Sequence, residues 1–372
     1  MEKNRNLKKK KHLKLGFIGG GINSTIGKIH YIASKLDDNW KLESGFFSRD
    51  QKDNIKSAKE FGVPLNRNYN KFELFLKKEK KLLDAVSLIT PPETHFYYLK
   101  KLLEKNFFVI CDKPLVVSST EIKKIKKIKN YRNLRITYNY TGYPIVRELK
   151  KIISKNKLGK IKKILFEMPQ DALTNNSRKK IKIKNWRLKD RHLPNICYDL
   201  GSHLFNLANF LLLENPSSVF GNYFNSSGIK NIHDNAMIML KYKSGINGFL
   251  WFGKSAVGYR NGLKLRIFGK KGSLTWHQMK PEEFELSKLD GSIIKYDLSS
   301  SNLQKNNKEC IRYKLGHPSG FIEAFANSYN DISNYYQSIK TDYTFGVNES
   351  GDITFLLEKS FESHKKKMWV NV

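Results

Sequence analysis

A chain of 372 residues exceeds the usual size of one domain and is long enough for two. The apolar fraction of 40%, with 23 Phe, 18 Tyr and 5 Trp, supports sizeable cores and excludes an intrinsically disordered protein. The formal net charge of +34 comes mostly from lysines spread along the whole chain, which indicates a solvated basic surface rather than a nucleic-acid site.

The N-terminal end is basic and lacks the apolar core of a secretory signal, so residues 1–12 are expected to form a disordered tail. No apolar run reaches about 18 residues, so no membrane span is expected. Cys111, Cys197 and Cys310 are isolated and show no C-x-x-C spacing, which argues against a disulfide framework and against a metal site. Reduced thiols fit a cytoplasmic protein.

The first predicted strand, residues 13–18, runs into three glycines and then into a helix that Ser24 can cap. Strand, glycine turn and helix are the context of a dinucleotide-binding fingerprint, in which the helix N-terminus faces the pyrophosphate. Gly19 and Gly21 fit the first two glycines, whereas Ser24 stands at the third position. Gly27 fits that role across a longer loop, and an ordinary tight turn is the alternative.

The second predicted strand, residues 42–47, ends at Ser48, Arg49 and Asp50. An acid at this point binds the ribose 2′-hydroxyl of NAD, and an arginine accommodates the 2′-phosphate of NADP. Ser48 and Arg49 therefore favour NADP, while Asp50 keeps NAD open.

Strands continue to alternate with helices up to residue 138, where residues 134–138 close the domain as a sixth strand. This alternation predicts a Rossmann-type, doubly wound parallel sheet over residues 13–138. The short apolar strand 107–110 leads into Cys111, Asp112, Lys113 and Pro114. Ligands bind beyond the carboxyl ends of such strands, which makes Lys113 a candidate for chemistry.

The pattern changes after residue 138, and residues 139–372 are predicted to form an α+β domain for substrate binding and oligomerisation. Four strands follow one another without crossover helices, which predicts a large, mostly antiparallel sheet. In residues 246–252 both faces carry large apolar groups. The second face should therefore be covered by another part of the chain or by another subunit, which suggests a homo-oligomer through this sheet.

Asp199 and His203 lie four residues apart on the long helix predicted for residues 195–213, so they share one helix face. A carboxylate beside a histidine can fix its tautomer and support proton transfer near neutral pH. Gly201 between them is expected to leave room for a ligand. The alternative is that Asp199 caps the helix and His203 is a core histidine.

These motifs together resemble the glucose–fructose oxidoreductase / inositol dehydrogenase / MocA (Gfo/Idh/MocA) family. That family carries a Glu-Lys-Pro motif after a strand of the first domain and an Asp-x-x-x-His pair in the second. Here the first motif reads Asp112-Lys113-Pro114, with aspartate in place of glutamate. Residues 139–144, 261–269 and 316–320 are similar to a sugar-dehydrogenase-like branch, and the resemblance spans residues 13–370.

The resemblance implies an NAD(P)-dependent oxidoreductase that transfers hydride between a nicotinamide cofactor and a hydroxyl or keto carbon of a cyclic polyol, sugar or sugar derivative. It implies three catalytic residues: Lys113 binds a substrate hydroxyl, His203 acts as general base, and Asp199 orients substrate or histidine. The expected cofactor contacts are Gly19, Gly20, Gly21, Ile22, Ser48, Arg49, Thr90, Pro91, His95, Asp112 and Lys113. The expected substrate pocket contains Tyr140, Arg147, Trp186, Arg187, Asp199 and His203.

Three other functions remain open at this point. A non-catalytic nucleotide sensor or scaffold would share the fold, and a redox-assisted glycosidase would retain its cofactor and return the hydride. Binding of nucleic acid through charge alone would show steep salt dependence.

Overall fold

The computed structural model describes residues 12–174, 189–314 and 316–372. Trp186 and Arg187, and the N-terminal tail up to residue 11, lie outside the described residues. The chain divides into two compact units, and each contains segments that are distant in sequence. The first unit comprises Met1–Leu115, Lys123–Asn139 and Ile322–Val347, and the second comprises Val116–Ile122, Tyr140–Phe321 and Asn348–Val372.

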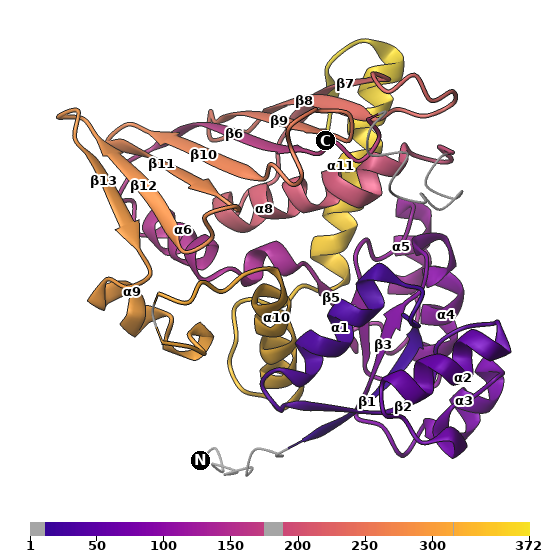
Figure 1. Cartoon of the computed structure of the whole chain (residues 1–372). Helices are drawn as coiled ribbons and strands as arrows, with labels where there is room; N and C mark the ends of the chain where they lie inside the picture. Colours follow the sequence, from indigo (N-terminus) through magenta and orange to yellow (C-terminus); the bar gives the residue numbers. More distant parts are fainter. Residues whose placement is uncertain (1–11, 175–188, 315) are drawn as a thin grey trace, which may run out of the picture. The chain divides into compact units, whose positions relative to one another are not determined.

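The first unit is built on a five-stranded parallel sheet with the strand order β2-β1-β3-β4-β5 (Figure 1). Its strands are β1 (Leu13–Gly19), β2 (Trp40–Phe46), β3 (Ala85–Ile89), β4 (Val109–Asp112) and β5 (Leu134–Thr137). The expectation of a sixth strand at residues 134–138 is wrong, because this segment pairs with β4 as the fifth strand of the sheet.

The helices of this unit connect consecutive parallel strands. They are α1 (Thr25–Lys35), α2 (Gln51–Glu60), α3 (Phe72–Glu79), α4 (Pro92–Glu104) and α5 (Ser119–Lys126), with a 3₁₀ turn η1 (Leu65–Arg67); the division into units falls within α5. The connection from β1 to β2 runs towards one edge of the sheet, and the connection from β3 to β4 runs towards the opposite edge. Because such crossovers are right-handed, α1 and α4 cover opposite faces of the sheet. The predicted doubly wound sheet is confirmed.

Helix α10 (Phe321–Tyr336) belongs almost entirely to the first unit, although the sequence places it in the second domain. Its Tyr329 is 1% exposed and lies edge-on to the rings of His30 and Trp40. The indole nitrogen of Trp40 donates to the carbonyl oxygen of Tyr329 at 3.0 Å. The amphipathic pattern of α10 predicts a buried face but does not say which core buries it.

The second unit is built on a nine-stranded sheet with the order β13-β12-β11-β10-β6-β9-β8-β7-β14. Strands β6 and β9 pair in parallel and all other neighbours pair antiparallel, so the predicted mostly antiparallel sheet is confirmed. The strands are β6 (Ile161–Pro169), β7 (Ser218–Phe224), β8 (Asn235–Lys241), β9 (Asn247–Gly253), β10 (Lys264–Gly269), β11 (Gly272–His277), β12 (Glu283–Lys288), β13 (Ile293–Asp297) and β14 (Val370–Asn371).

Helices lie against one face of this sheet, with α6 and α8 below it in Figure 1. The helical elements of the unit are η2 (Asn139–Gly142), α6 (Pro144–Ser154), the π-helical turn η4 (Cys197–Gly201), α8 (Ser202–Leu212), α9 (Ser301–Asn306), η5 (Lys308–Cys310) and α11 (Val347–Lys366). Leu250 and Phe252 of β9 are fully buried, while Met237 and Met239 of β8 are 40% exposed. One face of the sheet is therefore the core face, and the other is an apolar outer face in this chain.

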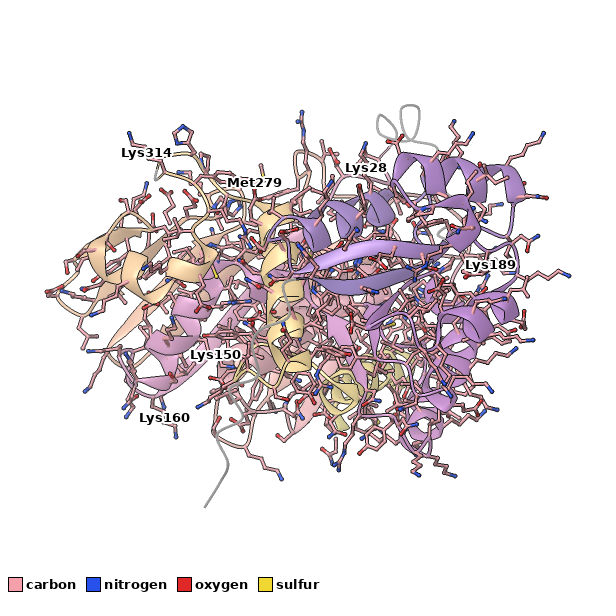
Figure 2. All side chains as sticks on the ribbon, turned by 90° about the horizontal axis from the view of Figure 1, so that it is seen from below. Lys28, Lys150, Lys160, Lys189, Met279 and Lys314 are labelled. Carbon is pink, nitrogen blue, oxygen red and sulfur yellow. The ribbon has the colours of Figure 1, made fainter. Side chains whose placement is uncertain are left out.

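The basic charge is distributed over both units. Lys28, Lys160 and Lys314 extend from three separate segments, and all three are exposed (Figure 2). Within the described ranges, no helix combines the length and the apolar character needed to cross a membrane.

Candidate active site

The predicted helix over residues 195–213 contains the π-helical turn η4, which continues as α8. Asp199 lies in the turn, and His203 lies in the first turn of α8. π-Helical turns are rare and often occur at functional sites. The spacing suggested a regular α-helix at Asp199 and His203, whereas the backbone that leads from one to the other is partly π-helical.

Gly201 packs against the core of the second unit. A Cβ atom at this position would lie 2.9 Å from a ring carbon of Phe252 and 3.0 Å from a methyl carbon of Leu357. The expectation that Gly201 leaves room for a ligand is therefore wrong. It leaves room for a strand and a helix of the same unit to approach the turn.

His203 is 6% exposed and lies edge-on to the ring of Tyr140, with the centroids 4.6 Å apart at 86°. The phenol oxygen of Tyr140 accepts a hydrogen bond from the side-chain amide of Asn261 at 3.1 Å. Burial raises the pKa of Tyr140, and the bond from Asn261 lowers it only in part. The phenol therefore stays protonated at neutral pH. The structure thus brings together two residues expected in the substrate pocket.

Asp199 is engaged by a lysine that the sequence did not single out. The ammonium group of Lys254 forms an ion pair with Oδ2 of Asp199. Lys254 follows β9 directly and is 8% exposed. Its amide donates to the carbonyl oxygen of Asp234, and its carbonyl accepts from the amide of Leu173. A buried cation that is held at both ends of its backbone fixes the position of the Asp199 carboxylate.

Arg147, also expected in the pocket, lies in α6 and is 6% exposed. Its Nε donates to the carbonyl oxygen of Thr141 at 3.0 Å, and its Nη1 lies 3.9 Å from the sulfur of Cys310. Within the second unit, this guanidinium therefore binds the chain segment that carries Tyr140.

In the first unit, the glycine turn after β1 requires glycine for steric reasons. Gly19 and Gly20 have φ values of 77° and 69°, which favour glycine. Ser24 caps α1 by accepting from the amide of Gly27 at 3.1 Å. A Cβ atom at Gly27 would lie 2.0 Å from the carbonyl oxygen of Gly20. Gly27 therefore lets the helix approach the turn closely, as the third glycine of the fingerprint does.

One amide of the glycine turn and one amide after β2 are engaged within the chain. The amide of Ile22 donates to the hydroxyl of Ser57 at 3.0 Å. Beyond β2, the hydroxyl of Ser48 accepts from the amide of Asp50, whose carboxylate in turn caps α2. Arg49 is exposed. Because the Asp50 carboxylate serves as a helix cap, Arg49 is the side chain at this strand end that a phosphate can approach from solvent.

The end of β3 is joined to the turn after β4 by His95, which is fully buried in α4. Its Nε2 lies 2.7 Å from the carbonyl oxygen of Thr90. Its Nδ1 lies 3.0 Å and 3.1 Å from the carbonyl oxygens of Pro114 and Leu115. Both ring nitrogens thus contact the backbone of this unit. Pro91, the N-cap residue of α4, follows Thr90 directly.

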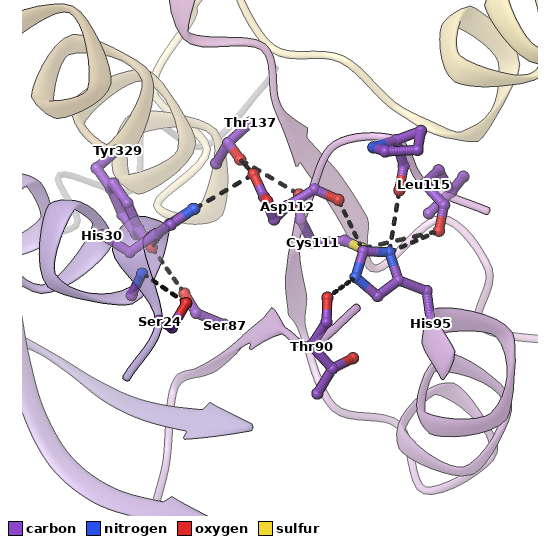
Figure 3. A network of polar contacts seen from close by, with 12 residues as sticks. Ser24, His30, Ser87, Thr90, His95, Cys111, Asp112, Leu115, Thr137 and Tyr329 are labelled. Atoms are coloured by element: carbon purple, nitrogen blue, oxygen red, sulfur yellow. Dashed lines mark hydrogen bonds and ion pairs between the residues drawn. The ribbon is translucent and has the colours of Figure 1, made fainter. Parts of the chain in front are cut away.

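Asp112 ends β4 and belongs to a buried polar network (Figure 3). Its Oδ1 lies 3.3 Å from Nε2 of His30 and 3.4 Å from the hydroxyl of Thr137. Burial acts to raise the pKa of Asp112. The hydrogen bond from His30 and the charge of Lys113 outweigh this effect, so the pKa is lowered. Asp112 is therefore a carboxylate directly before Lys113.

Cys111 precedes this carboxylate and is also fully buried. Burial and the charge of Asp112 raise the pKa of the Cys111 thiol well above its ordinary value. A protonated, buried thiol is a poor nucleophile, so Cys111 serves as a packing residue and not as a nucleophile. The peptide bond from Lys113 to Pro114 is cis. Within the described residues, no group of three or more His, Cys, Asp or Glu side chains is arranged to hold a metal ion.

Comparison with protein-family models gives two matches that follow the division between the Rossmann segment and the rest of the chain. Residues 13–140 match the model described as "Oxidoreductase family, NAD-binding Rossmann fold", and residues 146–275 match the "GFO/IDH/MocA C-terminal domain". The chain belongs to the Gfo/Idh/MocA family of oxidoreductases. The predicted family, and with it a dehydrogenase or reductase, is confirmed.

Relatives of this Gfo/Idh/MocA protein cover most of its length. An uncharacterized oxidoreductase, YfiI, of Bacillus subtilis is 26% identical and covers 86% of this chain and 84% of its own. A crystal structure of an oxidoreductase from Sinorhizobium meliloti has a TM-score of 0.85 at 27% identity, and covers 97% of this chain and all of its own. An inositol dehydrogenase homologue from Azotobacter vinelandii shares the fold, with a TM-score of 0.87 at 22% identity over 97% of this chain and 98% of its own.

The first unit of this Gfo/Idh/MocA member fits the NAD that its family model describes. The glycines at positive φ open the backbone of the turn, and the capped N-terminus of α1 follows them. Substitution of Gly21 would also place a Cβ atom 2.7 Å from the hydroxyl of Ser57. The turn is therefore lined by backbone, which is what close approach of a pyrophosphate requires.

Three residues of these networks were missed in the sequence. Lys254 is one lysine among many, and His30 is a single histidine in a helix, so neither pattern is specific. The only signal for His30 is its place on the buried stripe of α1, which also contains Ala33. Tyr329 gives no local signal, because its partners are separated from it by more than two hundred residues.

Proposed function

We propose that this protein is an NAD(P)-dependent dehydrogenase or reductase that acts on a hydroxyl-bearing carbon of a cyclic polyol, sugar or sugar derivative. The observation that carries the proposal is the arrangement around η4: His203 lies against Tyr140, and Asp199 is held by a buried lysine. We further propose that Lys113, at the carboxyl edge of the parallel sheet, completes the catalytic set with Asp199 and His203.

The chemistry follows from the residue types. When bound, a nicotinamide cofactor accepts a hydride from the carbon that carries the hydroxyl, or returns it. His203 takes the hydroxyl proton as a neutral imidazole, since histidine is the side chain best matched to proton transfer near neutral pH. The ammonium group of Lys113 stabilises the negative charge that develops on the oxygen. Asp199 orients the substrate or the histidine, while Lys254 holds its carboxylate in place.

The substrate class rests on relatives and on the polar groups around His203. The inositol dehydrogenase homologue from Azotobacter vinelandii is a complex with NADH and myo-inositol, and a levoglucosan dehydrogenase of similar fold is a complex with NADH and levoglucosan. In this chain, Tyr140, Asn261 and Gln278 form a continuous hydrogen-bonded row, with 2.5 Å between the side chains of Asn261 and Gln278. Phenol and amide groups of this kind suit the hydroxyls of a polyol.

A panel of polyols and sugars with NAD⁺ and NADP⁺ tests the proposal, with the absorbance of reduced nicotinamide as the readout. Turnover of at least one cyclic substrate is expected, with free reduced cofactor released. Bound cofactor with no turnover of any substrate would favour a sensor or scaffold. Glycoside cleavage without release of reduced cofactor would favour a redox-assisted glycosidase.

We also propose a preference for NADP, with Arg49 as the contact to the 2′-phosphate and Ser48 beside the ribose. The support is the exposure of Arg49 and the use of the Asp50 carboxylate as a helix cap. Gly19 to Ile22, Thr90, Pro91 and Asp112 remain proposed contacts of the turn and strand ends. For His95 the buried contacts to backbone favour a positioning role rather than direct contact with the cofactor.

We propose that the protein is a homo-oligomer through the outer face of the nine-stranded sheet. Met237, Met239 and Phe249 on this face are each at least 36% exposed in the single chain. Adjacent exposed apolar side chains of this size commonly mark an interface. Analytical ultracentrifugation of the full chain and of Met239→Lys would test this, because the charge should shift the assembly towards monomer. The proposed domains remain 13–138 for cofactor and 139–372 for substrate and assembly, except that α10 packs in the first unit. We propose a cytoplasmic protein with reduced cysteines.

A further inference from the structure

The turn that carries Lys113 is contacted by a buried histidine on each side. On the strand side, His30 of α1 approaches the carboxylate of Asp112. After Lys113 in the chain, His95 of α4 approaches the carbonyl oxygens of Pro114 and Leu115. Both histidines have no exposed surface. Neither is therefore placed to meet a substrate directly, but together they hold the residues before and after Lys113 (Figure 3).

The protons in the His30 network can be assigned from its partners. Asp112 is ionised and only accepts, so Nε2 of His30 carries a proton and donates to it. In a neutral ring, Nδ1 then accepts, and its neighbour at 2.8 Å is the hydroxyl of Tyr329. The hydroxyl of Ser87 lies 2.9 Å from the same phenol oxygen and donates to it. In this assignment each proton in the row from Ser87 to His30 faces an acceptor, and the longest separation is the 3.3 Å between Nε2 of His30 and Oδ1 of Asp112.

The second contact joins two strand ends. His95 lies between the carbonyl oxygen of Thr90, after β3, and the backbone that follows Lys113, after β4. Carbonyl oxygens only accept, so each ring nitrogen that carries a proton donates to the backbone of a strand end. The sulfur of Cys111 lies 3.5 Å from Nδ1 of the same ring. This histidine therefore fixes the spacing of the two loops at the edge of the sheet.

We propose that His30 and His95 are positioning residues for Lys113, and that Tyr329 and Ser87 hold His30 in the tautomer that binds Asp112. The proposal rests on the proposed function, in which Lys113 binds the reacting oxygen. It also gives α10 a role in catalysis: a tyrosine from the C-terminal part of the chain sets the geometry of a lysine in the Rossmann unit.

Tyr329→Phe is the sharpest test, because it removes one hydroxyl and preserves the ring. A small displacement of a catalytic group reduces the rate by up to about 100-fold. We expect a loss of that order in kcat, with KM and cofactor affinity near the wild-type values. Tyr69→Phe is the matched control: it removes a phenol hydroxyl that donates to Glu79 at 2.7 Å in the same unit, outside the network. This control should keep full activity.

A double variant separates positioning from a general structural effect. If Tyr329 acts through Lys113, then Tyr329→Phe added to Lys113→Met should cause no further loss of kcat, because coupled residues are not additive. An equal loss in both backgrounds would overturn the proposal. His95→Asn should behave in the same way as Tyr329→Phe.

An independent readout does not depend on turnover. Nitrogen-15 NMR of the histidine rings, with His30 assigned through His30→Asn, should show the His30 proton on Nε2 and an accepting Nδ1. Tyr329→Phe should shift the Nδ1 resonance of His30. A proton on Nδ1, or a resonance unaffected by Tyr329→Phe, would overturn the network even in an active enzyme. If the wild type turns over no polyol, the proposed function fails, and this spectrum still decides the histidine network.

Discussion

Substitution of Gly27 by alanine tests whether this residue replaces the missing third glycine of the cofactor turn. The added Cβ would lie 2.0 Å from the carbonyl oxygen of Gly20. Carbon and carbonyl oxygen normally come no closer than about 3.3 Å, so the turn and the helix must separate by roughly 1 Å. Since the obstacle is backbone, no change of rotamer can relieve the contact.

The magnitude follows from two opposing terms. Alanine in place of glycine in a helix interior contributes about 1 kcal/mol to stability. Overpacking costs about 1–3 kcal/mol, and contact with backbone places this site at the upper end. The free energy of unfolding should therefore fall by about 2 kcal/mol, which lowers Tm by roughly 4–8 °C in a unit of this size. Because the carbonyl of Gly20 belongs to the cofactor turn, nicotinamide cofactors should also bind at least about tenfold more weakly.

Thermal unfolding and fluorescence titration with reduced cofactor would measure both effects. Gly351→Ala is the matched control, because this helical glycine of α11 faces only a methyl carbon of Ile122, at 3.1 Å. A side chain can move by a few tenths of an ångström, so the control should be neutral or slightly stabilising. Wild-type Tm and wild-type cofactor affinity in Gly27→Ala would refute the close approach of α1 to the turn.

Three further predictions concern the first unit. Glu79→Gln should lower the free energy of unfolding in urea by about 2 kcal/mol, because it removes the charged, bidentate partner of Arg67 at 2.5 Å and 3.1 Å, while Glu43 at 2.6 Å still pairs with the guanidinium; an unchanged urea midpoint would contradict this. The pKa of Asp112 is lowered in the folded state, so its contribution to stability is complete above the unfolded value of about 4 and is lost as the pH falls through the folded value; the stability advantage of wild type over Asp112→Asn should therefore shrink on acidification, and a constant difference would count against it. Arg49→Ala should raise KM for NADP⁺ by about tenfold or more while leaving NAD⁺ unaffected, and equal effects on both cofactors would exclude a 2′-phosphate contact.

The Rossmann unit could be predicted well, because buried parallel strands appear as short apolar runs. All five residues of β3 are buried, for example, and glycine and helix signals separate the strands. The position of α10 could not be predicted. Its apolar face fits any core, and its partners, Trp40 and His30, lie about three hundred residues away in the sequence. Local patterns carry no information about such contacts.

The placement of Asp199 and His203 in one helical segment could be predicted because it depends on short spacing, while their catalytic roles stay a prediction. The supporting groups could not, because their selection depends on tertiary contacts. Lys254 has the same sequence environment as many solvent-exposed lysines, and only burial against Asp199 distinguishes it. The prediction for Gly201 failed for the same reason: a glycine between two polar residues suggests open space, whereas here it permits contact with Phe252.

The most direct test of the central claim is the turnover of His203→Asn with the best substrate of the wild type. Loss of a general base should reduce kcat by about 10²–10⁴-fold, while cofactor affinity stays at the wild-type value. A variant that keeps kcat near the wild-type value would contradict the assignment of proton transfer to His203, and with it the proposed active site.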